Sequence, residues 1–476
     1  MKTNPTLTWT IVLFSSIVAV YVALHLYYDL FSLPYFWDEL GVYSRAAIHM
    51  YEHGLGFLPK ALPDELSRGH PLLIPLIFAT SFKLFGCTVT VAKLTAACIY
   101  TTGIYYLYRI LLFKFKPWQA CIFAVLIAVQ PCFLAQSVLV LPEAPLMVCS
   151  IAACYYFIRG KYGAVSIALC AALFIKESAI ILPFIFFIVD LIVNPYKYRS
   201  LLYLVFIPLA SISLFFLVQY LQRGYVFYPL HTGLVKLESY YIHERYHEFS
   251  EFVYFGQGRP YLWFYLPAAF ILYYVIKQYP NIALRFKIDR QRFDFRFYIT
   301  ILSIFLAGLC FSVINYFLSR YTLYFLVLFY LAFIWIFFQP KKWTLINCAA
   351  IGVLIYNAIA YNHRNHYTDV NFSYVDHIKS CQAAINYLNT PAFKNKKVAM
   401  DFPVSVTTWN HYSGYFSTLS FESVPFDDSA NMVADYYVFT YPGNIDNLKL
   451  YRQHLDSVNT LSFGYAYVSI YRRKAP

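Results

Sequence analysis

Two adjacent carboxylates, Asp38 and Glu39, follow the first long apolar run of the chain, in the sequence Phe36-Trp37-Asp38-Glu39. One carboxylate of such a pair could take a proton from a hydroxyl group while the other orients that group. The same pair could be a solvated helix N-terminus, where acidic side chains offset the helix dipole. The pair is therefore a candidate acid–base site with a plain structural alternative.

Four further ionisable positions lie beside apolar runs. Arg68 and His70 precede Pro71, and a basic group at headgroup depth can hold a lipid phosphate. Glu143 and Lys176 lie between apolar runs, where a charge is costly unless it is compensated, so each is a candidate functional residue. The alternatives are interface anchors, a snorkelling lysine or a structural ion pair.

Arg320 is the only charged residue between Phe297 and Gln339. The planar fork of its guanidinium group suits a phosphate or diphosphate. An interfacial anchor is the alternative interpretation.

The segment His243-Glu244-Arg245-Tyr246-His247 matches H-E-x-x-H, in which two histidines on one helix face bind zinc. A membrane zinc metalloprotease is therefore an alternative class. A charged Arg245 inside the motif, a short tyrosine-rich loop and the lack of a third ligand at a standard spacing count against it. There is also no P-loop and no G-x-G-x-x-G turn, so the sequence does not support nucleotide use.

The composition indicates that membrane-spanning helices position these residues. Of 476 residues, 60% are hydrophobic and 13% are charged, whereas about a quarter are charged in a typical soluble chain. Continuous apolar runs near twenty residues long favour helices over a barrel. The first run, Trp9–Phe31, is too long for the core of a signal peptide and is predicted to be retained. Nine of ten cysteines lie in or beside apolar segments, which predicts no disulfide within the tail.

The distribution of charge predicts the topology. Eleven spans are expected, with Pro71–Gly86 lying along the membrane rather than across it. The inner loops then hold sixteen Lys or Arg and two Asp or Glu, as the positive-inside rule requires. The net charge of +13 is thus explained without nucleic acid. The predicted spans are Trp9–Phe31, 91–112, 118–137, 144–158, 162–176, 178–194, 201–221, 261–277, 297–318, 321–338 and 343–361.

This topology places the N-terminus in the cytoplasm and the candidate residues outside. A transmembrane domain is predicted at 1–361 and a small extracytoplasmic α/β domain at 362–476. The tail predicts a helix at Asp376–Leu388 and strands at Lys397–Met400, Tyr436–Thr440 and Tyr465–Tyr471. The predicted fold class is a mainly α polytopic membrane protein with a small C-terminal α/β domain.

The order of these features resembles the GT-C membrane glycosyltransferases, in the aminoarabinose-transferase (ArnT-like) and protein O-mannosyltransferase branch. The resemblance covers residues 10–340. Six motifs carry it: Asp38-Glu39 with a helix ending at Gly54, His70-Pro71 opening a helix that ends Leu84-Phe85-Gly86, Glu143, Lys176, His243 and Arg245 with Arg259-Pro260-Tyr261, and Arg320-Tyr321. Two departures are that His70 stands where the family usually has Lys, and that Glu143 stands where it usually has Asp.

The resemblance implies a glycosyltransferase with a polyprenyl-phosphate sugar as donor and inversion at the anomeric carbon. It implies that Asp38 deprotonates or orients the acceptor, and that Glu39, Glu143 or His243 contacts sugar or acceptor hydroxyls. It implies no required cofactor or metal, and leaves room for a weakly bound divalent cation. The acceptor is a glycan, a lipid or a protein, and a flippase for lipid-linked sugars is a further alternative. The candidate cations for the donor phosphate are Arg68, His70, Lys176, Arg245, Arg259 and Arg320.

Overall fold

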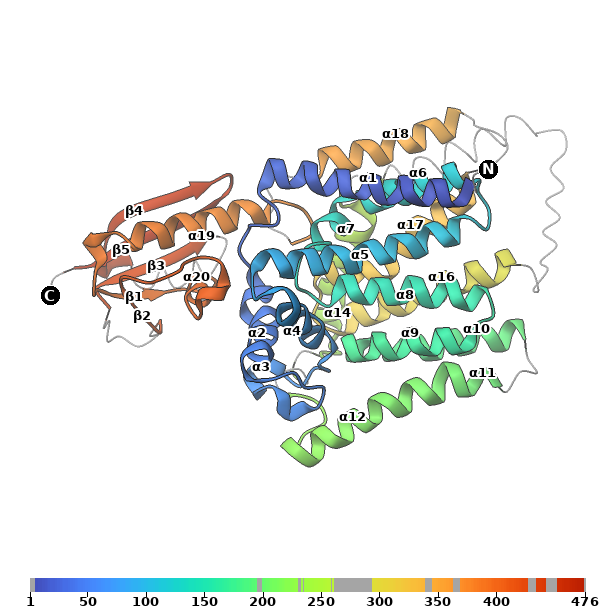
Figure 1. Cartoon of the computed structure of the whole chain (residues 1–476), viewed down its shortest axis with the longest axis horizontal. Helices are drawn as coiled ribbons and strands as arrows, with labels where there is room; N and C mark the ends of the chain where they lie inside the picture. The colour runs from blue at the N-terminus through green and yellow to red at the C-terminus, as the bar shows by residue number, and fades with distance from the viewer. Residues whose placement is uncertain are drawn as a thin grey trace.

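A computed structural model describes residues 5–194, 199–229, 233, 235–257, 259–260, 293–338, 345–362, 369–426, 434–441 and 452–474. It is mainly helical, with a sheet domain at the C-terminal end, as predicted. The helices of a bundle run side by side, and the sheet domain lies beyond one end of them (Figure 1). The bundle helices are α1 (Pro5–Tyr28), α5 (Val89–Leu111), α6 (Pro117–Ala128), α8 (Glu143–Ile158), α9 (Tyr162–Ile175), α10 (Ile181–Val193), α12 (Ile207–Arg223), α16 (Phe293–Ile314), α17 (Leu323–Phe337) and α18 (Leu345–Ala360).

Apolar side chains cover the outside of this bundle. Leu26 at the end of α1 is 81% exposed and Leu221 of α12 is 73% exposed. Such a surface suits lipid rather than water. Three described helices are long and apolar enough to cross a membrane, namely Pro5–Tyr28, Leu202–Arg223 and Arg296–Ile314, and shorter apolar helices accompany them. The total of eleven spans stays a prediction, and the span at 261–277 lies outside the described residues.

Two predicted helical segments differ in detail from the structure. The span predicted at 118–137 is divided into α6 and α7 (Pro131–Gln136), because Pro131 has no amide hydrogen for a continuous helix. The segment Pro71–Gly86 forms α4 (Leu73–Phe85). Thirteen residues are too few to cross the hydrocarbon core. This helix packs on α2 (Ser44–His53) at the end of the bundle that faces the sheet domain (Figure 1).

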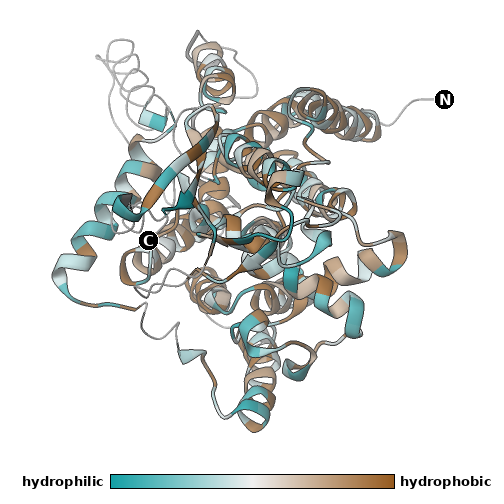
Figure 2. Ribbon diagram, turned by 90° about the vertical axis from the view of Figure 1, so that its left-hand side faces the viewer, coloured by the Kyte–Doolittle hydropathy of each residue, from teal (hydrophilic) through white to brown (hydrophobic). Residues whose placement is uncertain are grey.

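Short elements lie at the same end of the bundle. Glycines with positive φ end α2 at Gly54 and α4 at Gly86, and this backbone conformation suits glycine. Viewed along the bundle from the side of the sheet domain, the nearest elements carry many hydrophilic residues, whereas the helices behind them are mostly hydrophobic (Figure 2). The other short helices there are α3 (Asp64–Ser67) and α14 (Ser239–Ser250). The short helix α11 (Arg199–Leu201) lies at the opposite end of the bundle, next to α10 (Figure 1).

The C-terminal domain is a five-stranded mixed sheet of order β2-β1-β3-β5-β4. The central strand β3 pairs in parallel with β1 and antiparallel with β5. Helices α19 (Tyr374–Leu388) and α20 (Val404–Thr407) accompany the sheet, and β1 has its predicted bounds. The strands are β1 (Lys397–Met400), β2 (Glu422–Val424), β3 (Tyr436–Tyr441), β4 (Leu455–Phe463) and β5 (Ala466–Arg473).

The sheet domain packs directly on the loop that carries Asp38. The hydroxyl of Tyr415 donates to the carbonyl oxygen of Tyr35 over 3.0 Å. The ring of Trp37 lies against that of Phe402, with centroids 4.8 Å apart. The conformation of the Asp38 loop therefore depends on both parts of the chain.

Candidate active site

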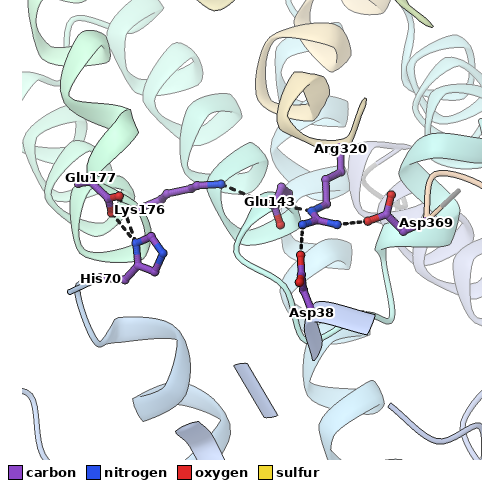
Figure 3. Close-up of polar contacts among 7 residues, drawn as sticks. All are labelled: Asp38, His70, Glu143, Lys176, Glu177, Arg320 and Asp369. Carbon is purple, nitrogen blue, oxygen red and sulfur yellow. Dashed lines mark hydrogen bonds and ion pairs between the residues drawn. The ribbon is translucent and has the colours of Figure 1, made fainter. Parts of the chain in front are cut away.

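A buried arginine gathers carboxylates from three segments of the chain (Figure 3). Arg320 lies in η7 (Ser319–Thr322), a short turn between α16 and α17. Its guanidinium group forms ion pairs with Asp38 and with Asp369, and its Nε lies 3.7 Å from Oε1 of Glu143. Burial lowers the pKa of Arg320, but the carboxylates outweigh this and raise it well above its ordinary value. Arg320 is therefore a permanent cation at the centre of an acidic cluster.

A second cation reaches the same cluster from the end of α9. Nζ of Lys176 donates to Oε1 of Glu143 over 3.0 Å and lies 3.6 Å from the ring centroid of Tyr321. Glu143 therefore links Lys176 to Arg320. The cluster contains three carboxylates and two cations, so an additional proton or cation would balance it.

Glu39 is next to Asp38 in sequence, but its side chain faces the protein interior. Its carboxylate accepts hydrogen bonds from the amides of Phe36 and Val140 over 2.9 and 2.6 Å, and it lies 3.8 Å from Nζ of Lys93. Both charged side chains are fully buried. Glu39 thus connects the loop of Asp38 to the segment that leads into Glu143. Among the described residues, its hydrogen bonds and its ion pair go to Phe36, Val140 and Lys93 rather than to the cluster around Arg320.

The local structure explains this orientation. Asp38 precedes η1 (Glu39–Tyr43), a single π-helical turn that continues into α2. π-Helical turns are rare and occur often at functional sites. Trp37 has a φ of 45°. Asp38 and Glu39 follow it as neighbours in a helical turn, and side chains at adjacent positions of such a turn point in different directions.

A second ion pair lies beside the cluster. Nδ1 of His70 lies 3.1 and 3.0 Å from the two carboxylate oxygens of Glu177. Burial would raise the pKa of Glu177, but the charge and hydrogen bond of His70 outweigh it and lower the pKa to about 2. Glu177 therefore stays ionised beside His70.

A cavity of about 780 Å³ lies beside Lys176 and the His70–Glu177 pair. His70, Lys176, Glu177, Tyr43 and Tyr321 line one part of it. The remaining lining is largely apolar and comes from α12, α16 and the segment that follows α12. Its apolar residues are Ile180, Ile212, Phe216, Leu217, Val226, Phe227, Val235 and Phe311.

Four other predicted residues do not join the cluster. The guanidinium group of Arg245 donates to the carbonyl oxygen of Ile314, and Arg259 donates to that of Phe252 over 2.9 Å. Both arginines are buried and satisfy backbone carbonyls. Arg68 is exposed and forms no ion pair with a described residue.

His243 is exposed on α14, so the structure does not bring it to the cluster. His247 of the H-E-x-x-H match lies 3.8 Å from Glu251. Among the described residues, no three His, Cys, Asp or Glu side chains are grouped to hold a metal ion.

Sequence reasoning missed Asp369 and Tyr43. Asp369 follows the last apolar helix, and an acidic residue at that position is a signal of the kind that identified Glu143. Burial raises the pKa of Asp369, and the charge of Arg320 opposes this effect. Tyr43 had no comparable signal, because tyrosine is abundant throughout the chain.

Comparisons with known proteins place this geometry in context. A family model described as dolichyl-phosphate-mannose-protein mannosyltransferase matches residues 69–221. The crystal structure of ArnT from Cupriavidus metallidurans in the apo state is 14% identical, with a TM-score of 0.57 and coverage of 98% of each chain. The same protein bound to undecaprenyl phosphate is 12% identical, with a TM-score of 0.54 and coverage of 97% of this chain and 98% of that one. No curated protein matches the sequence.

Proposed function

We propose, from the confirmed resemblance of this chain to the GT-C membrane glycosyltransferases, that it transfers a sugar from a polyprenyl-phosphate carrier to an acceptor. The proposed reaction takes place at the outer face of the membrane, with the N-terminus in the cytoplasm. The observation that carries the proposal is the junction of the buried charge cluster with a large apolar cavity. A lipid-linked sugar has this same combination of a charged head and an apolar tail.

The cavity suits the donor. Its apolar lining between α12 and α16 can take the first isoprenoid units, because apolar surface is stabilised when it leaves water. Lys176 and His70 line the polar part, where their charges would stabilise the phosphate as it leaves. We assign this stabilisation to these side chains, and the proposed reaction requires no metal ion.

The acceptor hydroxyl would approach Asp38. In the proposed step the carboxylate of Asp38 takes the hydroxyl proton, the acceptor oxygen forms a bond to the anomeric carbon, and the bond from that carbon to the phosphate oxygen breaks. The attack comes from the face opposite the phosphate, so the configuration inverts. Arg320 forms an ion pair with Asp38 and would hold it in place. Glu143, next to Arg320, would contact a hydroxyl of the sugar or acceptor.

Asp38→Asn tests this assignment. An amide cannot take up the proton, so we expect the release of polyprenyl phosphate to fall by about 10²- to 10⁴-fold, the usual contribution of a general base. The assay uses isolated membranes supplied with a panel of polyprenyl-phosphate hexoses and pentoses, and it follows the free carrier and the glycosylated product. Transport of donor without sugar transfer by the wild-type protein would indicate a flippase instead.

Glu65→Gln is the matched control. Glu65 is an exposed acid in the same outer loop, so its loss should leave the rate unchanged. An Asp38→Asn variant that is as active as Glu65→Gln would remove Asp38 from the catalytic role.

A further inference from the structure

A second polar site lies between the outer helices and the C-terminal domain. Arg45 comes from α2, and Trp409 lies just after α20 in the C-terminal domain. The guanidinium carbon of Arg45 lies 5.0 Å from the centroid of the Trp409 ring. Both side chains are half-buried. The contact therefore joins two parts of the chain that are distant in sequence.

Both residues have an enclosed nitrogen without a partner. Nε of Arg45 and Nε1 of Trp409 are buried and form no hydrogen bond with any described residue. Each of these nitrogens can donate a hydrogen bond but cannot accept one. Leaving a buried donor unpaired costs free energy, and here two such donors belong to side chains in contact. A ligand that brings acceptor oxygens between α2 and the C-terminal domain would satisfy both.

The charge around this contact is positive. Arg68 is exposed, and neither it nor Arg45 forms an ion pair with a described residue. Burial lowers the pKa of Arg45, and the charge of Arg68 lowers it further. Glu52 and Glu65 are exposed acids on the same outer helices, and neither pairs with these arginines. By contrast, the cations beside the cavity, His70, Lys176 and Arg320, are all paired with carboxylates.

We propose that Arg45, Trp409 and Arg68 bind an acidic group of the acceptor. This inference rests on the proposed function and specifies its acceptor as an anion with carboxylate or phosphate oxygens. A guanidinium group and an indole N–H suit such oxygens, and charge-assisted hydrogen bonds are the stronger kind. Asp38 directly precedes η1, which continues into the helix that carries Arg45. The same stretch of helix would thus hold the acidic group and present the base.

The site also gives the C-terminal domain a role in acceptor choice. Trp409 belongs to that domain, whereas the cavity assigned to the donor is lined by the bundle and its outer loops. Donor and acceptor would then be recognised by different elements. Substitutions at Arg45 should affect the acceptor and leave the donor unaffected.

Equilibrium binding to the purified full chain in neutral lipid nanodiscs tests the site. The probes are glucuronate, glucose 1-phosphate and a short-chain phosphatidic acid, with methyl glucoside as the neutral reference. We expect the wild-type protein to prefer the acidic probes. Arg45→Gln should weaken their binding by about tenfold, the effect of losing one charge-assisted hydrogen bond. Trp409→Phe keeps a ring and loses the N–H donor, so it should weaken binding by a smaller factor.

Two control variants locate the probe. Lys60→Gln removes an exposed basic residue of the same outer loop and should leave binding unchanged. Lys176→Gln changes the donor cavity and should leave the binding of glucuronate, which has no phosphate, unchanged. Preference for one acidic probe identifies the source of the anion as a sugar acid, a sugar phosphate or a lipid headgroup.

Three results would overturn the inference. The first is equal binding of acidic and neutral probes. The second is an Arg45→Gln variant that binds like Lys60→Gln. The third is loss of glucuronate binding in Lys176→Gln, which would place that probe in the donor cavity. Thermal unfolding of each variant identifies any that fails to fold, and Arg45→Lys then provides a milder change. Sugar transfer without acidic-probe binding would refute this site alone, whereas binding without release of polyprenyl phosphate would refute the proposed function alone.

Discussion

Among single residues, the contacts of Arg320 differ most from the role that the sequence predicted for it. Sequence reasoning proposed it as a ligand of the donor phosphate, but its fork is shared between Asp38 and Asp369. A phosphate at Arg320 would have to compete with two carboxylates, whereas Lys176 and His70 each have one carboxylate partner among the described residues. We therefore infer that Arg320 positions Asp38 and that Lys176 and His70, which line the large cavity, are the better candidates for the phosphate.

Arg320→Lys separates these roles. Lysine keeps the charge but not the fork, so it cannot hold both carboxylates in the same geometry. We expect kcat to fall by about 10- to 100-fold, because small misplacements of reacting groups lower the rate by such factors. The KM for the donor should be nearly unchanged. Initial-rate measurements over a range of donor concentrations check this. Arg159→Lys, at the opposite end of α8, is the control. A raised KM with unchanged kcat in Arg320→Lys would instead assign Arg320 to the phosphate.

At the scale of elements, one buried carboxylate connects the segments that carry the site. Glu39 receives amide hydrogen bonds from the loop before η1 and from the segment before α8. Lys93 of α5 lies beside it as the buried counter-charge. Glu39 was predicted to act in catalysis with Asp38, whereas its contacts indicate that it positions Asp38 and Glu143.

Glu39→Gln should lower stability as well as activity. The amide can accept from one backbone N–H but presents its NH₂ group to the other, and Lys93 loses its counter-charge. Removing one partner of a buried pair is expected to cost about 3–5 kcal/mol. Adding Lys93→Met should recover part of this loss, because both charges are then gone. Thermal unfolding in detergent measures the effect, and the exposed substitution Glu422→Gln is the control. Equal unfolding temperatures for Glu39→Gln and Glu422→Gln would contradict the positioning role of Glu39.

At the scale of the whole molecule, the site requires one orientation in the membrane. Asp369 of the cluster lies just before α19 of the sheet domain, and the sheet domain lies beyond one end of the bundle (Figure 1). The positive-inside rule predicts that this end faces outward. The junction between α8 and α9, with Lys161, lies at the opposite end of the bundle.

Cysteine labelling in intact cells tests this orientation. A membrane-impermeant maleimide should react with Ser462→Cys, an exposed position on β4, and should miss Lys161→Cys until the membrane is opened. The ten native cysteines are first replaced, and the cysteine-free protein gives the background signal. Labelling of Lys161→Cys from outside would reverse the predicted topology and place the proposed reaction in the cytoplasm.

Part of the fold was predictable because it depends on local patterns. Continuous apolar runs indicate helices that lipid can surround, and the apolar strand β1 and helix α19 were predicted at nearly their observed bounds. Strand β4 was missed, since most of its residues are polar and exposed at the edge of the sheet. The division between α6 and α7 was also missed, although Pro131 was its visible sign.

The candidate residues could be identified without a structure. Asp38, Glu143, Lys176 and Arg320 are charged positions beside apolar runs, and the cost of desolvating a charge makes such positions informative without any structure. Their partners became visible once the chain was folded. Asp369 pairs with Arg320 although the two are 49 positions apart in the sequence, and Asp38 pairs with Arg320 over a separation of 282 positions. No local pattern encodes such contacts, because they arise when distant helices pack and each buried charge must find a partner.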